Sequence, residues 1–206
     1  MKTNSLTIRL VLVVSFLVLP GIAAAGSPTD WVRASVLEVK STLSGQEPGA
    51  GLTQEQFSKT SRVLGKCFNF HKMAVLALGR HWRQRSPQER QEFVHLFREL
   101  LERSFLLKLS THAGVVQRYV GESIERDRAI VQALVKAEVG EVPIDYFLLR
   151  HDDTWKVYDL GIEGVRLSRI YRAQFNKVIT RSSYNELLRR MHLKLEEAVM
   201  EADVQR

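Results

Sequence analysis

The sequence contains a single cysteine, Cys67, so the chain cannot form an internal disulfide. It also has only 5 prolines and 3 tryptophans among its 206 residues. Without a disulfide, the fold must be held together by a hydrophobic core, and a chain of this length is long enough to bury one. We expect Cys67 to be a small buried apolar side chain, which is a common role for a free cysteine.

The motifs of several large enzyme classes are missing as well. The chain has no P-loop, dinucleotide-binding fingerprint, nucleophile elbow, paired-cysteine metal signature or HExxH sequence. Its 6 histidines are dispersed, and the spacing of His71 and His81 does not place them on one face of a helix. We therefore expect no cofactor and no bound metal.

Two aspartates, Asp145 and Asp159, remain the best candidates for acid–base chemistry. We expect them on adjacent strands, where alternation turns Asp145 away from Ile144 and toward solvent. Asp159 ends its strand, so it could cap backbone N–H groups or pair with Arg172. We favour these structural roles and assign no catalytic residue, although a catalytic carboxylate stays open as an alternative.

No apolar run is long enough to cross a bilayer comfortably. The longest, Leu10–Leu19, has about half of the ~20 residues that a spanning helix needs. It follows Lys2 and Arg9 and precedes the small residues Ala23–Ala25, which is the pattern of a cleaved signal peptide. An uncleaved membrane anchor is the alternative.

We therefore predict a signal peptide over residues 1–25 and one domain over residues 26–206 that is exported across a membrane. The formal net charge of +7 becomes +5 when Lys2 and Arg9 leave with the signal peptide. Outside the cytosol, this charge favours anionic lipid head groups or an acidic protein as partner, and argues against nucleic acid.

Helix starts are clearly marked at both ends of the chain. Ser27, Thr53 and the segment Ser86–Glu89 have the residue types of N-terminal helix caps, and apolar residues follow each at helical spacing. A region without helical spacing follows these three predicted helices. Helical spacing returns over Arg166–Ile179 and after Ser182–Ser183.

The middle of the chain alternates with a period of two, which is typical of strands. The predicted strands are Val115–Val120, Ala129–Val139, Val142–Arg150 and Trp155–Leu160. Short turns between them predict sequential antiparallel hairpins. Helices followed by an antiparallel sheet and then by further helices predict an α+β fold, with a cone-shaped space between the helices and a curved sheet.

Three segments together resemble one known family. They read ALGRHWRQRSPQERQEFVHLFRELLERSF (77–105), VPIDYFLLRHDDTWKVYDLGIEGVRL (142–167) and YRAQF (171–175). In this order and spacing they resemble the MlaC, or toluene-tolerance, family of ABC-transporter auxiliary components. The resemblance implies an NTF2-like cone, in which helices on a curved antiparallel sheet enclose an apolar cavity.

The resemblance also implies a function. It is that of a periplasmic shuttle that carries diacyl phospholipid between the outer membrane and an inner-membrane ABC transporter, which maintains outer-membrane lipid asymmetry. The implied protein partners are an outer-membrane lipoprotein complex and an MCE-domain protein of the transporter.

The energetics of a lipid carrier require a large cavity. Two acyl tails hold roughly 30 methylene groups, and exposing them to water costs about 20 kcal/mol or more. The cavity must therefore lie near the top of the usual range of ~300–1,000 Å³. The bulky apolar residues expected on the long helix, the sheet and the following helix are its predicted lining: Phe97, Leu101, Phe105, Val131, Ile144, Tyr146, Leu148, Val157, Ile162, Val165, Tyr171 and Phe175.

Asp159, Gly164 and Arg172 are predicted to have structural roles beside this cavity. Each of the lining residues has an alternative role as ordinary core. Three other functions stay open from the sequence: a carrier for a hopanoid or isoprenoid, a periplasmic enzyme that uses the same cone as its active site, and an interaction protein that uses its last helix and has no cavity.

Overall fold

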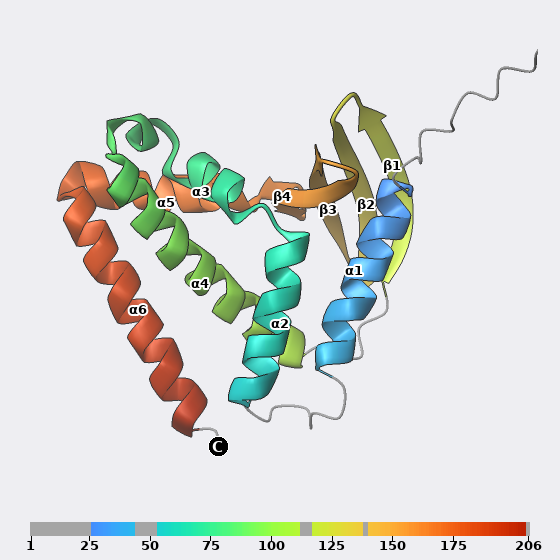
Figure 1. Cartoon of the computed structure of the whole chain (residues 1–206), viewed down its shortest axis with the longest axis horizontal. Helices are drawn as coiled ribbons and strands as arrows, with labels where there is room; N and C mark the ends of the chain where they lie inside the picture. The colour runs from blue at the N-terminus through green and yellow to red at the C-terminus, as the bar shows by residue number, and fades with distance from the viewer. Residues whose placement is uncertain (1–25, 44–52, 112–116, 138–139, 205–206) are drawn as a thin grey trace, which may run out of the picture.

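The computed structural model describes residues 26–43, 53–111, 117–137 and 140–204, so the predicted signal peptide lies outside the described residues. The described chain forms an α+β fold, which confirms the predicted fold class (Figure 1). Its elements are α1 (Pro28–Thr42), α2 (Gln54–Cys67), α3 (Phe70–Leu78), the 3-10 helix η1 (Gly79–Gln84), α4 (Pro87–Thr111), β1 (Gln117–Glu125), β2 (Arg128–Lys136), β3 (Glu141–His151), β4 (Thr154–Ile162), β5 (Val165–Arg166), α5 (Leu167–Arg181) and α6 (Tyr184–Val204).

The helix starts that local sequence signals predict are confirmed. The Ser27 hydroxyl accepts a hydrogen bond from the first turn of α1. Thr53 and Gln56 form a reciprocal capping box at the start of α2. Ser86 and Glu89 exchange the same pair of bonds at the start of α4, at 3.2 and 2.7 Å. These bonds satisfy N–H groups that have no partner within the helix itself.

One predicted helical run is interrupted at Phe68 and Asn69. Phe68 has extended backbone angles and forms an isolated parallel bridge with Val157 of β4. The Asn69 N–H donates to the Val157 carbonyl at 2.8 Å, and the Asn69 side chain caps α3 by accepting from the Lys72 N–H. Asn69 and Val157 lie far apart in the sequence, so local periodicity could not predict the break between α2 and α3.

The sheet is an antiparallel meander in the order β1-β2-β3-β4-β5. The sequence did not predict β5, a strand of two residues. Glu163 and Gly164 connect it to β4 with φ angles of 51° and 77°. A two-residue hairpin loop with positive φ at both positions matches the right-handed twist of the strands, and the second position favours glycine.

Two irregularities of register bend the sheet. One lies between Tyr119 and Gly121 of β1, and the other lies between Phe147 and Leu148 of β3, opposite Tyr158. An extra residue in one strand increases local twist and bends the ladder. The sheet therefore presents a curved inner face to the helices.

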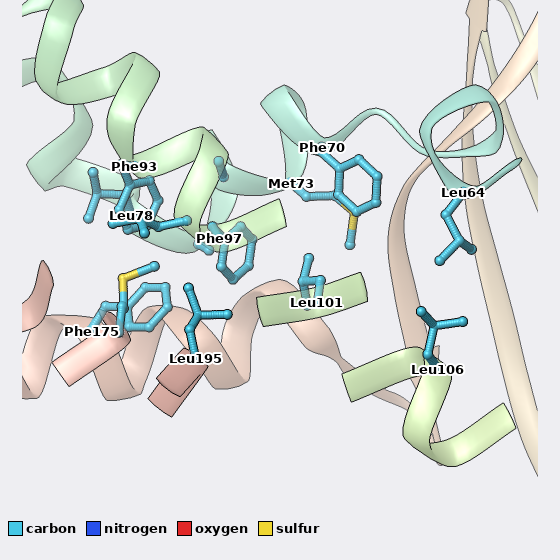
Figure 2. Close-up of a cluster of buried hydrophobic side chains, with 14 of the residues drawn as sticks. Leu64, Phe70, Met73, Leu78, Phe93, Phe97, Leu101, Leu106, Phe175 and Leu195 are labelled. Carbon is cyan, nitrogen blue, oxygen red and sulfur yellow. The ribbon is translucent and has the colours of Figure 1, made fainter. Parts of the chain in front are cut away.

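Buried apolar residues form two clusters, one among the helices and one on the sheet. The helical cluster joins residues from α1 through α6, and Cys67 is buried in it as predicted (Figure 2). In the sheet cluster, Val32 of α1 packs against the inner face. The start of α1 is fixed to β1 because Glu122 accepts hydrogen bonds from the N–H and the hydroxyl of Thr29, at 2.7 and 2.6 Å.

Within the described part of the chain, none of the helices combines the length and the apolar character that a bilayer-spanning segment requires.

Candidate functional site

The predicted lining residues separate into several groups in the structure. The first group, Phe97, Leu101 and Phe175, belongs to the helical cluster, where Leu101 is 0% exposed. Tyr171 packs against Phe97 with ring centroids 5.0 Å apart. Figure 2 shows Phe97 and Leu101 among the other buried side chains of this cluster. These side chains are surrounded by other parts of the protein.

The second group lies on the inner face of the sheet. Val131, Leu148 and Val157 are buried in the sheet cluster, and Tyr146 packs against it while half-buried. Their shared face follows from the register, which pairs Val131 with Tyr146 and Leu148 with Val157. Because Val32 of α1 packs into this cluster, together with Phe68, Phe105 and Leu167 from the other helices and their connections, these residues are core in the structure.

Phe105 lies at the junction of the two clusters. It is half-buried and packs against both of them, as Phe68 and Leu167 also do. Its ring lies 5.5 Å from that of Phe68, at the point where α2 meets β4. The C-terminal half of α4 therefore places an aromatic ring between the helical layer and the sheet.

The third group continues along the inner face beyond the sheet cluster. Ala133, Ile144, Ile162 and Val165 are neighbours across β2 to β5 in the register. Exposure increases along this row: Ala133 is 1% exposed, Ile144 and Ile162 are half-buried, and Val165 is 50% exposed. The inner face thus has an apolar end that the protein leaves partly open at the β5 edge.

Val135 and Val142 extend this open apolar surface, and the sequence analysis did not include them. They form the next pair across β2 and β3 and are both half-buried. Alternation could have found them, because Val135 follows Val131 and Ala133 at every second position and Val142 precedes Ile144 in the same way. The row of Val135, Val142, Ile144, Ile162 and Val165 is called the open inner face below.

Polar groups also lie on the inner side. The Tyr146 hydroxyl is 3.0 Å from Nε2 and 3.2 Å from Oε1 of Gln117. Burial raises the pKa of Tyr146 to about 12, and it also raises the pKa of Tyr171, whose hydroxyl interacts with Ser104. Such groups can orient the polar part of a ligand whose remainder is apolar.

The raised pKa of Tyr146 predicts a loss of stability at high pH. The folded state favours the neutral phenol, so this contribution is present below pH 10 and is lost as the pH rises toward 12. Tyrosinate absorbance should show one fewer tyrosine titrating near pH 12 in a Tyr146→Phe variant. An unchanged late phase in this variant would contradict the assignment.

Asp159 is completely buried at the end of β4, where it organises the chain that leads into α5. Its Oδ1 accepts hydrogen bonds from the N–H groups of Leu160 and Ser168, both at 3.0 Å. Its Oδ2 accepts from the Ser168 hydroxyl at 2.6 Å and lies 3.1 Å from Nε of Arg166. The predicted capping of backbone N–H groups is confirmed.

The predicted pairing of Asp159 with Arg172 is wrong. Arg172 donates from Nε to the carbonyl of Leu76 at 2.8 Å, and it lies over Gly79 at the end of α3. The reason is geometric. The Asp159 carboxylate is directed toward β5 and the start of α5, where Arg166 is the adjacent cation, whereas Arg172 lies further along α5 on the side that contacts α3.

Asp145, the other candidate base, lies on the outer face of the sheet, opposite the side of Ile144 and Tyr146. It pairs in register with Gly161, and a Cβ at Gly161 would lie 3.1 Å from the Asp145 Cβ. Asp145 is half-buried rather than fully turned to solvent. It therefore sits apart from the open inner face.

A separate pocket of about 410 Å³ lies between α3, η1 and the start of α4. None of the predicted lining residues contributes to it, since its walls are formed by His71, Trp82, Pro87, Arg90, Gln91 and Val94. Among the described residues, no cluster of three or more His, Cys, Asp or Glu side chains is arranged to hold a metal ion.

Comparisons with known proteins extend these observations. No curated protein matches the chain. Among solved structures, a phospholipid-binding protein from Ralstonia solanacearum, determined in complex with a phospholipid, superposes with a TM-score of 0.74. It is 25% identical, and the match covers 84% of this chain and 99% of that protein. The family model described as MlaC protein matches residues 34–192, so the chain belongs to the MlaC family, as its sequence motifs predicted.

Proposed function

We propose that this protein binds a phospholipid and carries it through the periplasm. The observation that carries the proposal is the open inner face, a row of half-buried apolar side chains that ends at the exposed Val165 and that the described helices leave partly uncovered. Membership of the MlaC family and the similarity to a phospholipid-binding protein solved with a phospholipid support the choice of ligand.

The packing indicates where the acyl tails would lie. Phe97, Leu101 and Phe175 are already in contact with other core side chains, so a tail beside them would have to displace well-packed protein. The open inner face and Phe105 have free apolar surface without such displacement. We therefore place the tails along the open inner face, with one end beside the half-buried ring of Phe105.

The pocket beside Trp82 suits the tails less well. Its volume of about 410 Å³ lies in the lower part of the range for ligand sites, and its walls include Arg90, Gln91 and His71. Two acyl tails need a longer and more apolar surface, since shielding them is worth about 20 kcal/mol or more. The open inner face meets the requirement of apolar character.

We further propose that the lipid moves between an outer-membrane lipoprotein complex and the MCE-domain protein of an inner-membrane ABC transporter. Release into water would cost about as much as exposing both tails, so transfer should take place while the carrier is docked on its partner. This role would maintain the lipid asymmetry of the outer membrane.

A structural role also explains the buried carboxylate on β4 better than catalysis does. The Asp159 carboxylate is fully buried, and both of its oxygens are engaged by protein donors or by Arg166. A general base needs direct access to the proton that it removes. The surroundings of Asp159 favour a structural role, so we propose a carrier rather than an enzyme.

Lipid extraction from the purified protein tests the proposal. Mass spectrometry of the extract should show a diacyl phospholipid at about one molecule per protein chain, and a periplasmic protein of similar size, purified in parallel, should show none. A hopanoid or isoprenoid at that ratio would replace the phospholipid assignment with a different cargo. The absence of any stoichiometric lipid would overturn the carrier proposal itself.

A further inference from the structure

One face of the helical layer carries positive charge without compensating acids. The elements α3, η1 and α5 contain no Asp or Glu residue at all. Their cationic side chains, called the basic face below, are Lys72, Arg80, Arg83, Arg169, Arg172, Lys177 and Arg181. All of them are exposed except Lys72, which is half-buried.

The elements that carry these cations pack side by side. Helix α5 runs along α3 (Figure 1). Arg172 of α5 donates to the Leu76 carbonyl of α3 at 2.8 Å. Arg80 of η1 donates to Oδ1 of Asn176 in α5, also at 2.8 Å. Arg169, Lys177 and Arg181 lie near the start, in the second half and at the end of α5, so the positive charge extends along the helix.

Ion pairs neutralise part of the positive charge on the other helices. Helices α1, α2, α4 and α6 each pair some of their cations with an acid one turn away on the same helix, as in Arg33–Asp30, Lys59–Glu55 and Arg103–Glu99. Among the described residues, no member of the basic face takes part in an ion pair. The net positive charge of the protein is therefore least neutralised over α3, η1 and α5.

The basic face is bordered by exposed aliphatic side chains. Ile170, beside Arg169 in α5, is 40% exposed, and Val165 in β5 is 50% exposed. Val165 is also the outermost residue of the open inner face. The positive surface and the accessible end of the apolar row are thus adjacent at the start of α5.

We propose that the basic face docks the protein on an anionic phospholipid bilayer. Arginine guanidinium groups match phosphate geometry, and each Lys or Arg near an anionic membrane contributes about 1 kcal/mol of attraction. Ile170 and Val165 would enter the head-group region beside these cations. The inference goes beyond the cargo, because it concerns the surface on which the protein docks. It does not depend on which lipid the protein carries.

Vesicle flotation at low ionic strength tests the docking. Vesicles of phosphatidylglycerol and phosphatidylcholine in equal parts should bind the protein, vesicles of phosphatidylcholine alone should not, and added salt should reverse the binding. The variant Arg169→Gln/Lys177→Gln/Arg181→Gln should bind about a hundredfold more weakly, because each cation contributes about fivefold. None of these three residues belongs to the open inner face.

The matched control variant is Arg62→Gln/Arg128→Gln/Lys136→Gln, which removes the same charge from exposed positions elsewhere. It should weaken binding by less than about tenfold, since its cations lie off the basic face. Equal losses in the two variants would overturn a localised face. A failure of the wild type to bind the anionic vesicles would overturn the proposal.

Lipid extraction from the same variants separates this proposal from that of the cargo. The basic-face variant should still contain lipid at the wild-type ratio while it loses vesicle binding. Loss of the lipid together with vesicle binding would show that the substitutions damage the carrier itself, and would count against a separate docking surface.

Discussion

Replacing Asp159 by alanine is expected to lower the free energy of unfolding by about 3–5 kcal/mol, a large part of the stability of a domain of this size. The substitution leaves the N–H and hydroxyl of Ser168 without an acceptor in a buried site. It also leaves the Arg166 guanidinium without its carboxylate. The measurement is urea unfolding followed by circular dichroism.

Two further variants show whether the loss comes from the hydrogen bonds of Asp159. Asp159→Asn keeps one carbonyl acceptor but removes the charge that faces Arg166, so we expect an intermediate loss. Asp145→Ala, on a neighbouring strand and half-buried, should cost less than about 1 kcal/mol. Stability of Asp159→Ala within about 1 kcal/mol of the wild type would refute the structural role.

The second large effect is expected on lipid content. The variant Ile144→Glu introduces a charge in the middle of the open inner face, where it would meet the acyl tails. Placing an unpaired carboxylate against hydrocarbon costs several kcal/mol. At 1.4 kcal/mol for each factor of ten, the lipid that co-purifies with the protein should fall at least about tenfold.

The matched control for this variant is Leu134→Glu. Leu134 is also a half-buried aliphatic residue of the sheet, but it lies on the outer face, opposite the side of Ala133 and Ile144. Its substitution should leave the lipid content within about twofold of the wild type, provided that both variants unfold at similar urea concentrations. Equal lipid loss in the two variants would argue against the open inner face as the binding surface.

Local signals predicted the helix starts because a cap is a contact within four residues. Ser86 and Glu89, for example, carry the whole capping box between them. The break at Phe68 and Asn69 could not be predicted in this way, because the Val157 carbonyl that fixes it comes from a distant strand. The two residues of β5 are too few to establish an alternating pattern.

Alternation predicted the face of the sheet correctly but could not predict how deeply each residue lies. Val131 and Ile144 share the inner face, yet α1 buries the first and leaves the second half-buried. That difference depends on where α1 docks through Thr29 and Glu122, a contact between distant segments. Arg166 rather than Arg172 lies beside Asp159 because the β4–β5 hairpin, which the sequence did not predict, brings Arg166 back alongside β4.

Photo-crosslinking with a phospholipid that carries a diazirine in its acyl tails tests the location of the cargo most directly. After irradiation, fragmentation mass spectrometry can assign each adduct to a single residue. Adducts should concentrate at Ile144, Ile162 and Phe105, on the inner side of the molecule. Adducts confined to outer-face residues such as Leu134, or to the pocket around Trp82, would contradict the proposed position of the acyl tails.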